Sequence, residues 1–222
     1  MSERKDTKSE KNLALDRLLK QQPSLWRGRD QRDQRHVSQD TGYQKLNQLL
    51  PTGGWPLGAV TEILVDQWGN GEMQILLPLI VKLSQDSPVV FIAPPHHPYA
   101  PALEQAGINL SRLLIIDNQI SSEDTWWCAE KILKHPECRA TFVWTERLHH
   151  HRIRRLQLAA STSNTLGFLL RSGRPVDTPI PLRIKVSRRV NELHIRLLKS
   201  RFGWQQNAST TLSHTDTWNR DQ

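Results

Sequence analysis

The sequence predicts an α/β protein built on a mostly parallel sheet flanked by helices, with an antiparallel hairpin at its C-terminal edge. Between residues 59 and 171, five short apolar runs alternate with segments of helical spacing, which is typical of a parallel sheet. Two alternating runs follow, LRIKVSRR and ELHIRLLKS, separated only by Val190 and Asn191, and this spacing is typical of a hairpin. With 222 residues, the chain is long enough for one sizeable core.

The predicted parallel strands are apolar, β-branched runs bounded by turn residues. The first, AVTEILV, follows PTGGWPLG, where three glycines and two prolines in eight residues indicate a turn. We expect Gly53, Gly54 and Gly58 to form this turn and Trp55 to cover an edge of the core. The remaining predicted strands are PVVFIAPP, RLLIIDN, RATFVWT and TLGFLLR.

The predicted helices lie before and between these strands. They are YQKLNQLL, MQILLPLIVKLSQ, PALEQAG, SEDTWWCAEKILKH and HRIRRLQLAAS. Pro78 should kink the second of them or lie within its first turns, and a serine with acidic residues favours the start of the fourth. In the fifth, Ile153, Leu156 and Ala160 share one side.

The two ends differ from the centre in composition. A hydrophobic fraction of 37% and a mean hydropathy of −0.57 are low for a chain that is packed throughout. We therefore expect a polar, partly disordered tail over residues 1–40 with one amphipathic patch, LALDRLL, a folded domain over 41–200, and a flexible tail over 201–222.

Membrane insertion and secretion are not expected from the sequence. It contains no apolar run of 18 residues, and its first residues lack the apolar core of a secretory signal, so we expect a cytoplasmic protein. Cys128 and Cys138 lack the paired spacing of a zinc site and should be reduced residues near or in the core.

The net charge of +8 is unevenly distributed. Residues 41–138 hold five Lys/Arg against ten Asp/Glu, whereas residues 139–205 hold fourteen against three. Such a basic half attracts phosphate backbones or an acidic protein partner, although a merely solvated surface is the simpler interpretation. The candidate partner- or DNA-binding residues are Arg147, Arg152, Arg154, Arg155, Arg171, Arg174, Arg183, Arg188 and Arg189, with Phe202 and Trp204 as apolar contacts.

Histidines and tryptophans give weaker signals. The runs 149–151 and 96–97 are adjacent histidines whose side chains point in different directions, so we expect exposed loop residues and no metal site. Trp126 and Trp127 should pack in a helix with one ring partly exposed, with a stacking platform for bases as the alternative.

The turn DQWGNGEMQ after the first parallel strand has the position of a phosphate-binding loop. In such loops glycine amides surround the phosphates, a lysine reaches the β/γ oxygens and a Ser/Thr hydroxyl binds magnesium. Here Gly69 and Gly71 are followed by Glu72 and Met73. The Glu72 carboxylate would repel a triphosphate, and the methionine side chain does not bind Mg²⁺.

Four separated blocks in order resemble a known family. TGYQKLNQLLPTGGWPLGAVTEIL and FIAPPHHPYAPALEQAGINLSRLLII resemble the RecA recombinase core, and the likeness covers roughly residues 41 to 200. Within that superfamily, LWRG, LPTGGWPLGAVTE, PPHHPYAPAL and RRLQLAA resemble the ImuA family, accessory proteins of bacterial mutagenic translesion synthesis.

This resemblance implies a scaffold without the hydrolase. The glutamate that orients water in RecA-like ATPases falls on Pro95, and the acidic residue at the end of the fourth strand falls on Trp144 and Thr145, with only Glu146 nearby. The segments where RecA has its two DNA-contacting loops are short. We therefore expect a protein with no catalytic residues and no cofactor.

The family implies partners in the SOS response. These are an ImuB-like homologue of Y-family polymerases and an error-prone, replicative-type polymerase of the α class, with RecA and DNA as further candidates. The alternative is a SulA-type cell-division inhibitor that binds FtsZ, because EILVDQWGNGEMQILLPLIVKL also resembles that family.

Overall fold

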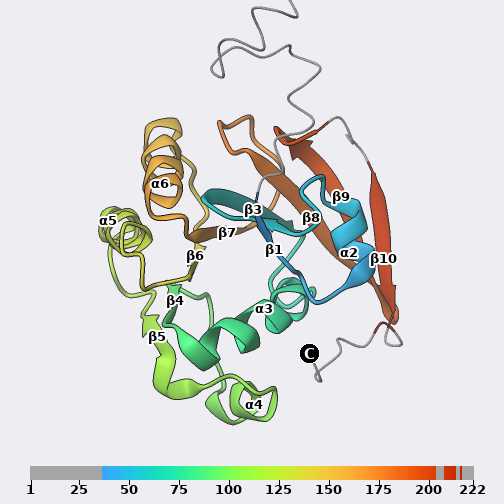
Figure 1. The fold of residues 1–222 in the computed structure, drawn as a ribbon, viewed down its shortest axis with the longest axis horizontal. Helices are drawn as coiled ribbons and strands as arrows, with labels where there is room; N and C mark the ends of the chain where they lie inside the picture. Colours follow the sequence, from blue (N-terminus) through green and yellow to red (C-terminus); the bar gives the residue numbers. More distant parts are fainter. Residues whose placement is uncertain (1–36, 204–207, 214–215, 217–222) are drawn as a thin grey trace, which may run out of the picture. The chain divides into compact units, whose positions relative to one another are not determined.

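The fold is taken from a computed structural model that describes residues 37–203, 208–213 and 216. The predicted LALDRLL patch, the LWRG block and Trp204 lie outside the described residues. The described chain is organised around an eight-stranded sheet in the order β10-β9-β8-β3-β7-β6-β4-β5 (Figure 1). Strands β3 to β8 are mutually parallel, and at one side β9 pairs antiparallel both with β8 and with the edge strand β10. The predicted fold class is thus confirmed.

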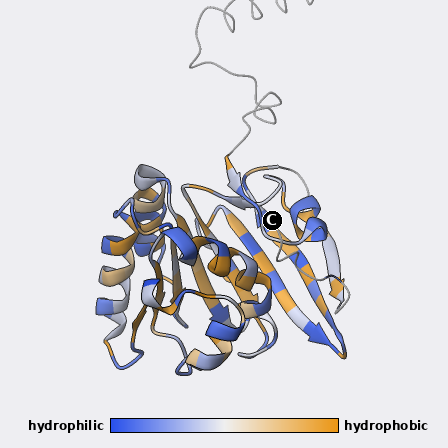
Figure 2. Ribbon diagram, turned by 60° about the horizontal axis from the view of Figure 1, so that its bottom comes forward, coloured by the Kyte–Doolittle hydropathy of each residue, from blue (hydrophilic) through white to orange (hydrophobic). Residues whose placement is uncertain are grey.

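The strands coincide closely with the apolar runs of the sequence. The parallel strands are β3 (Ala59–Val65), β4 (Val89–Ile92), β5 (Leu113–Ile116), β6 (Ala140–Trp144), β7 (Leu166–Ser172) and β8 (Leu182–Arg189). The predicted hairpin is β8 with β9 (Glu192–Ser200), joined through Val190, which has a positive φ of 45°. Hydrophobic and hydrophilic residues alternate along the hairpin strands (Figure 2), although the first three residues of β8 are all buried, and β3 is buried throughout.

Helices cover both faces of the sheet. They are α2 (Gln44–Leu49), α3 (Glu72–Asp86), α4 (Ala100–Gln105), α5 (Ser122–Leu133) and α6 (His150–Ser163), with a short 3-10 turn, η2 (Leu110–Arg112). Buried residues of α2 and α3 form one apolar cluster with one face of the sheet. Buried residues of α5 and α6 form a second cluster with the other face. All five predicted helices are therefore present.

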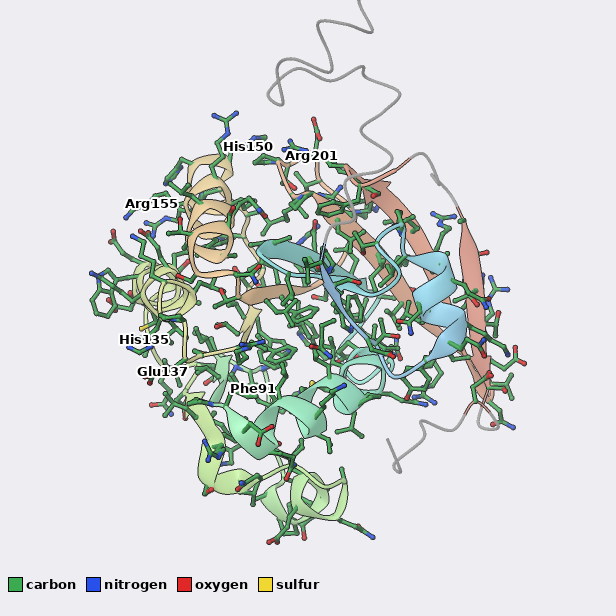
Figure 3. The ribbon with its side chains drawn as sticks, viewed as in Figure 1. Phe91, His135, Glu137, His150, Arg155 and Arg201 are labelled. Atoms are coloured by element: carbon green, nitrogen blue, oxygen red, sulfur yellow. The ribbon has the colours of Figure 1, made fainter. Side chains whose placement is uncertain are left out.

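Aromatic rings fill the centre of the α3 face. Phe142 and Phe168 stack with ring centroids 4.8 Å apart, and Phe91 meets Phe142 edge to face. Trp55 is fully buried and meets Phe168 edge to face at 5.2 Å. Figure 3 shows Phe91 inside the molecule, while Arg155 and Arg201 point outwards. The rings of Phe91, Phe142 and Phe168 thus pack β4, β6 and β7 against one another in the cluster that α2 and α3 cover.

The turn before β3 is built as its glycines predict. Gly53 and Gly58 adopt positive φ angles of 72° and 66°, which strain other residues. At Gly54 a Cβ atom would lie 2.5 Å from the carbonyl oxygen of Gln39, so a side chain does not fit. With Trp55 buried, the structural role predicted for this turn is confirmed.

Both predicted tails contain residues that belong to the fold. Ser38–Gln39 form β1, which pairs with β2 (Trp55–Pro56). Ser209–Ser213 form β10, the edge strand beside β9, with Leu212 buried. This corrects the expectation of tails over 1–40 and 201–222. The sequence STTLS is polar and short, and it becomes a strand because the open edge of β9 supplies backbone partners.

Among the described residues, no helix is long and apolar enough to cross a membrane.

Candidate functional site

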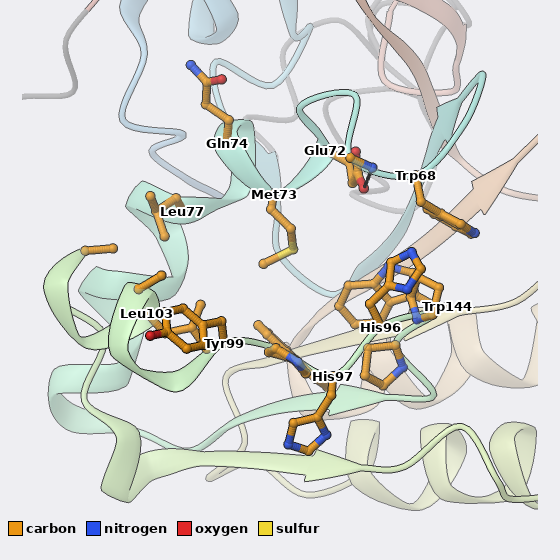
Figure 4. Close-up of a pocket in the computed structure, with 17 residues that line it drawn as sticks. Trp68, Glu72, Met73, Gln74, Leu77, His96, His97, Tyr99, Leu103 and Trp144 are labelled. Atoms are coloured by element: carbon orange, nitrogen blue, oxygen red, sulfur yellow. Dashed lines mark hydrogen bonds between the residues drawn. The ribbon is translucent and has the colours of Figure 1, made fainter.

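A cavity of about 390 Å³ opens where α3, α4 and the carboxyl ends of β4 and β6 meet (Figure 4). Its wall is mainly apolar: Trp68, Met73, Leu77, Phe91, Leu103 and Trp144 line it, with the prolines and histidines of residues 94–98 and with Tyr99 at an exposed position. In open α/β sheets, ligands bind at this end of the strands. The cavity is therefore the candidate functional site.

The glycine-rich turn between β3 and α3 forms one side of this site. Gly69 and Gly71 have positive φ angles of 83° and 104°. Gly71 cannot be replaced easily for a second reason, because a Cβ atom there would lie 2.3 Å from Cδ2 of Leu193 on β9. The turn is thus packed directly against the β8–β9 hairpin.

Glu72, the first residue of α3, turns its side chain back into this turn. Its Oε1 accepts a hydrogen bond from the backbone N–H of Gly69 at 2.8 Å (Figure 4). The residue is only 4% exposed, and its Oε2 is buried without a hydrogen-bond partner among the described residues. The carboxylate occupies a place where helix N-termini bind anions.

The two other positions singled out by the resemblance line the same cavity. Pro95 lies in the loop after β4, and Trp144 ends β6 with its ring 5.3 Å from that of Phe91. Trp144 is 7% exposed, whereas Glu146, the nearest acidic residue, is exposed. An indole and a pyrrolidine ring therefore stand at these two places in the wall.

A buried ion-pair triad lies on the opposite face of the sheet. Glu62, in the middle of β3, is fully buried and pairs with Arg171 of β7 and Arg183 of β8. The Glu62 oxygens lie 3.2 Å from Nε of Arg171 and 2.5 Å from Nε of Arg183. These contacts join three adjacent strands by charge as well as by backbone pairing.

The triad also fastens the segment that joins β7 to β8. Arg171 donates to the carbonyl oxygen of Arg174, and Arg183 donates to the carbonyl oxygen of Val176 and to the hydroxyl of Thr178. Glu62 is a residue that the sequence reasoning missed. The signal that could have found it is a single charged residue in the mainly apolar run AVTEILV, since a buried charge needs a partner.

The arginines predicted to form one basic surface have different environments. Arg171 and Arg183 are buried in the triad, which corrects the expectation that both belong to the surface. Arg152 and Arg155 of α6 pair with Glu123 and Glu130 of α5, at 3.5 and 2.7 Å, and Arg188 donates to Gln74 on α3. The exposed ones are Arg147, Arg154, Arg155, Arg174, Arg188 and Arg189. Their positions on α6, on two loops and on the hairpin do not form one continuous stripe along a single element.

The remaining predicted contacts are partly in the core. Phe202 packs against the α3-side cluster, so it is not simply a free apolar contact. Trp126 is buried and Trp127 is 59% exposed with Lys131 over its ring, as expected for helix packing with one ring open. Cys128 and Cys138 are free thiols, and burial raises the pKa of the Cys138 thiol.

Fold and site together define a class: an α/β protein whose inner strand β3 leads through a glycine-rich turn into a helix that begins with a carboxylate. No protein-family model matches the chain. The chain is similar to the cell division inhibitor SulA of Serratia marcescens, with 24% identity over 143 residues, which is 64% of this chain and 79% of that protein. This likeness supports a distant relationship to SulA.

Proposed function

We propose that this protein is a non-catalytic, RecA-like accessory protein of the SOS response that acts in mutagenic translesion DNA synthesis by binding polymerase partners. The observation that carries the proposal is that Glu72, Pro95 and Trp144 all line one cavity. By the resemblance to RecA-like ATPases, these residues fall at the phosphate, base and metal positions of such an enzyme. A site that holds a carboxylate, a proline and an indole at these places is unsuited to phosphoryl transfer, which depends on positioned positive charge.

The ImuA resemblance supports a role in translesion synthesis, and the likeness to SulA supports a link to the SOS response. The proposed partners are an ImuB-like polymerase homologue and an error-prone polymerase of the α class. The exposed arginines offer hydrogen bonds and charge for an acidic protein surface or for a DNA backbone. The protein would act by binding, with no cofactor.

The absence of catalysis can be tested on the purified protein. We expect no ATP turnover above a buffer control and no tight ATP binding. Glu72→Lys alone should not create activity, since Pro95 and Trp144 remain. ATP turnover that disappears on substitution within residues 69–73 would contradict the proposal.

The cellular role is best tested by substituting exposed arginines that do not belong to the buried triad of Glu62, Arg171 and Arg183. Arg147→Glu with Arg154→Glu changes two exposed side chains. Truncation before Phe202 is less suitable because it removes β10. We expect the double variant to lower capture of the polymerase partners and damage-induced mutagenesis while the protein stays folded. Lys131→Glu, on neighbouring α5, is the matched control.

A second candidate function, cell-division inhibition through FtsZ, is favoured by the similarity to SulA. The two functions separate in one experiment. Overproduction of a division inhibitor makes growing cells filament and the protein captures FtsZ, whereas a translesion accessory protein changes mutation frequency after DNA damage without filamentation. Filamentation with unchanged mutagenesis would replace our first proposal by the second.

A further inference from the structure

The turn between β3 and α3 has the architecture of an anion site, although it carries no cationic side chain. α3 is a helix of 15 residues, and the backbone N–H groups of its first turn lack partners further back along the helix. Gly69 and Gly71 take left-handed conformations, and the backbone N–H of Gly69 points into the turn at the Glu72 carboxylate. Such a turn attracts a small oxyanion.

A second observation shows that the turn is already occupied. The Glu72 carboxylate is only 4% exposed, accepts the Gly69 N–H at 2.8 Å and has a second oxygen buried without a partner among the described residues. A glutamate at a helix start normally keeps its charge in water. Here it is folded back onto the Gly69 N–H and the helix N-terminus, whose attraction offsets the lost hydration.

We propose that residues 66–72 form an oxyanion-binding loop whose ligand is the chain's own Glu72 carboxylate, and that removing this carboxylate opens the loop to inorganic phosphate or pyrophosphate. The carboxylate and a phosphate present the same kind of acceptor oxygen to backbone amides. Space for the replacement exists, because Gly69 and Glu72 both border the cavity of about 390 Å³. Because the loop has no lysine to reach the phosphate, we expect this binding to be weak.

The internal ligand holds the turn in its bound shape at all times. Gly71 packs against Leu193 of β9, and Gln74 of α3 accepts a hydrogen bond from Arg188 of β8 at 3.0 Å. The β8–β9 hairpin therefore rests on the turn that Glu72 closes. A loop that a nucleotide orders in other proteins is here ordered by the fold itself, independently of nucleotide supply.

The experiment is chemical rescue of a variant that lacks the carboxylate. Glu72→Ala is compared with the unchanged protein and with Glu104→Ala, which removes an exposed glutamate from α4. Thermal midpoints are measured with 10 mM pyrophosphate or phosphate and with sodium chloride at equal ionic strength. We expect Glu72→Ala to melt at a lower temperature and pyrophosphate to raise its midpoint by about 3 °C, with no such rise for the other two proteins.

Glu72→Gln gives an independent measure. Its amide oxygen still accepts the Gly69 N–H, so this variant should respond to pyrophosphate less than Glu72→Ala does. If Glu72→Ala is unfolded in buffer, recovery of its folded signal on titration with pyrophosphate replaces the midpoint. Equal responses of Glu72→Ala and Glu104→Ala to pyrophosphate would overturn the inference. These measurements involve neither ATP turnover nor a partner. The inference about the loop can therefore be wrong while the proposed function is right, and the proposed function can be wrong while this inference is right.

Discussion

The hydroxyl of Tyr43 donates a hydrogen bond to the backbone carbonyl of Gln74, 3.1 Å away. This carbonyl needs an outside donor because Pro78, four residues further along α3, has no N–H to offer it. Tyr43 precedes α2, so the contact joins α2 to α3 across the core, and burial raises the pKa of the tyrosine. The helix tolerates its internal proline because a distant side chain supplies the missing donor.

Tyr43→Phe should therefore lower the free energy of unfolding by about 1–1.5 kcal/mol, because the Gln74 carbonyl loses its donor. In a Pro78→Ala background the new N–H can serve that carbonyl, and the same tyrosine change should cost less than half as much. Urea denaturation of the four proteins gives the coupling as a double-mutant cycle. Equal costs in both backgrounds would show that the hydroxyl does not compensate for the proline.

Glu62→Gln should be far more damaging, because it leaves Arg171 and Arg183 buried without their counter-charge. Breaking one partner of a buried ion pair costs about 3–5 kcal/mol of the free energy of unfolding. Denaturant melts compare it with Glu104→Gln, an exposed glutamate whose substitution should change stability by less than about 0.5 kcal/mol. A loss as small as that of the control would mean that water reaches the triad.

Trp55→Ala should destabilise the fold by about 3–5 kcal/mol, because the ring is fully buried against Phe168. Trp127→Ala removes an indole of the same size that is 59% exposed, so it should cost little. Thermal or urea unfolding of both variants measures the contrast. Unchanged stability of Trp55→Ala would contradict the structural role of this ring.

Glu130 links α5 to α6, because its two carboxylate oxygens lie 2.7 Å from Lys134 and 2.7 Å from Arg155. The hydrogen bond from Lys134, together with that from Arg155, lowers the pKa of Glu130 below its ordinary value. A carboxylate with a lowered folded-state pKa adds stability above its unfolded-state pKa, about 4.3, and this stability is lost as the pH falls through the folded-state value.

Glu130→Gln should thus cost about 0.5–1 kcal/mol at pH 7, and the difference from the unchanged protein should disappear in acid. Denaturation at a series of pH values measures this, with Glu137→Gln at an exposed position as the control. A cost that stays constant down to pH 2 would mean that the charge of Glu130 is not what stabilises the α5–α6 contact.

Local pattern determined most of the architecture. Apolar runs such as AVTEILV fix strand positions because burial on both faces tolerates few polar residues, and the glycines before β3 are required by backbone angles that are local properties. The anomaly at Glu72 was also visible in sequence, since a carboxylate after a glycine-rich turn departs from phosphate-loop chemistry.

Features that need residues far apart in the sequence were decided only by the tertiary structure. STTLS forms β10 because β9 offers an open edge, and Arg171 is buried because Glu62, 109 residues earlier, lies beside it. The cavity likewise exists only where the ends of β4 and β6 approach α3. Propensity and periodicity act over a few neighbouring residues, so the sequence by itself determines where strands, helices and turns form. Strand pairing, burial of charge and cavity shape depend on which distant segments the fold brings together, so only the tertiary structure decides them.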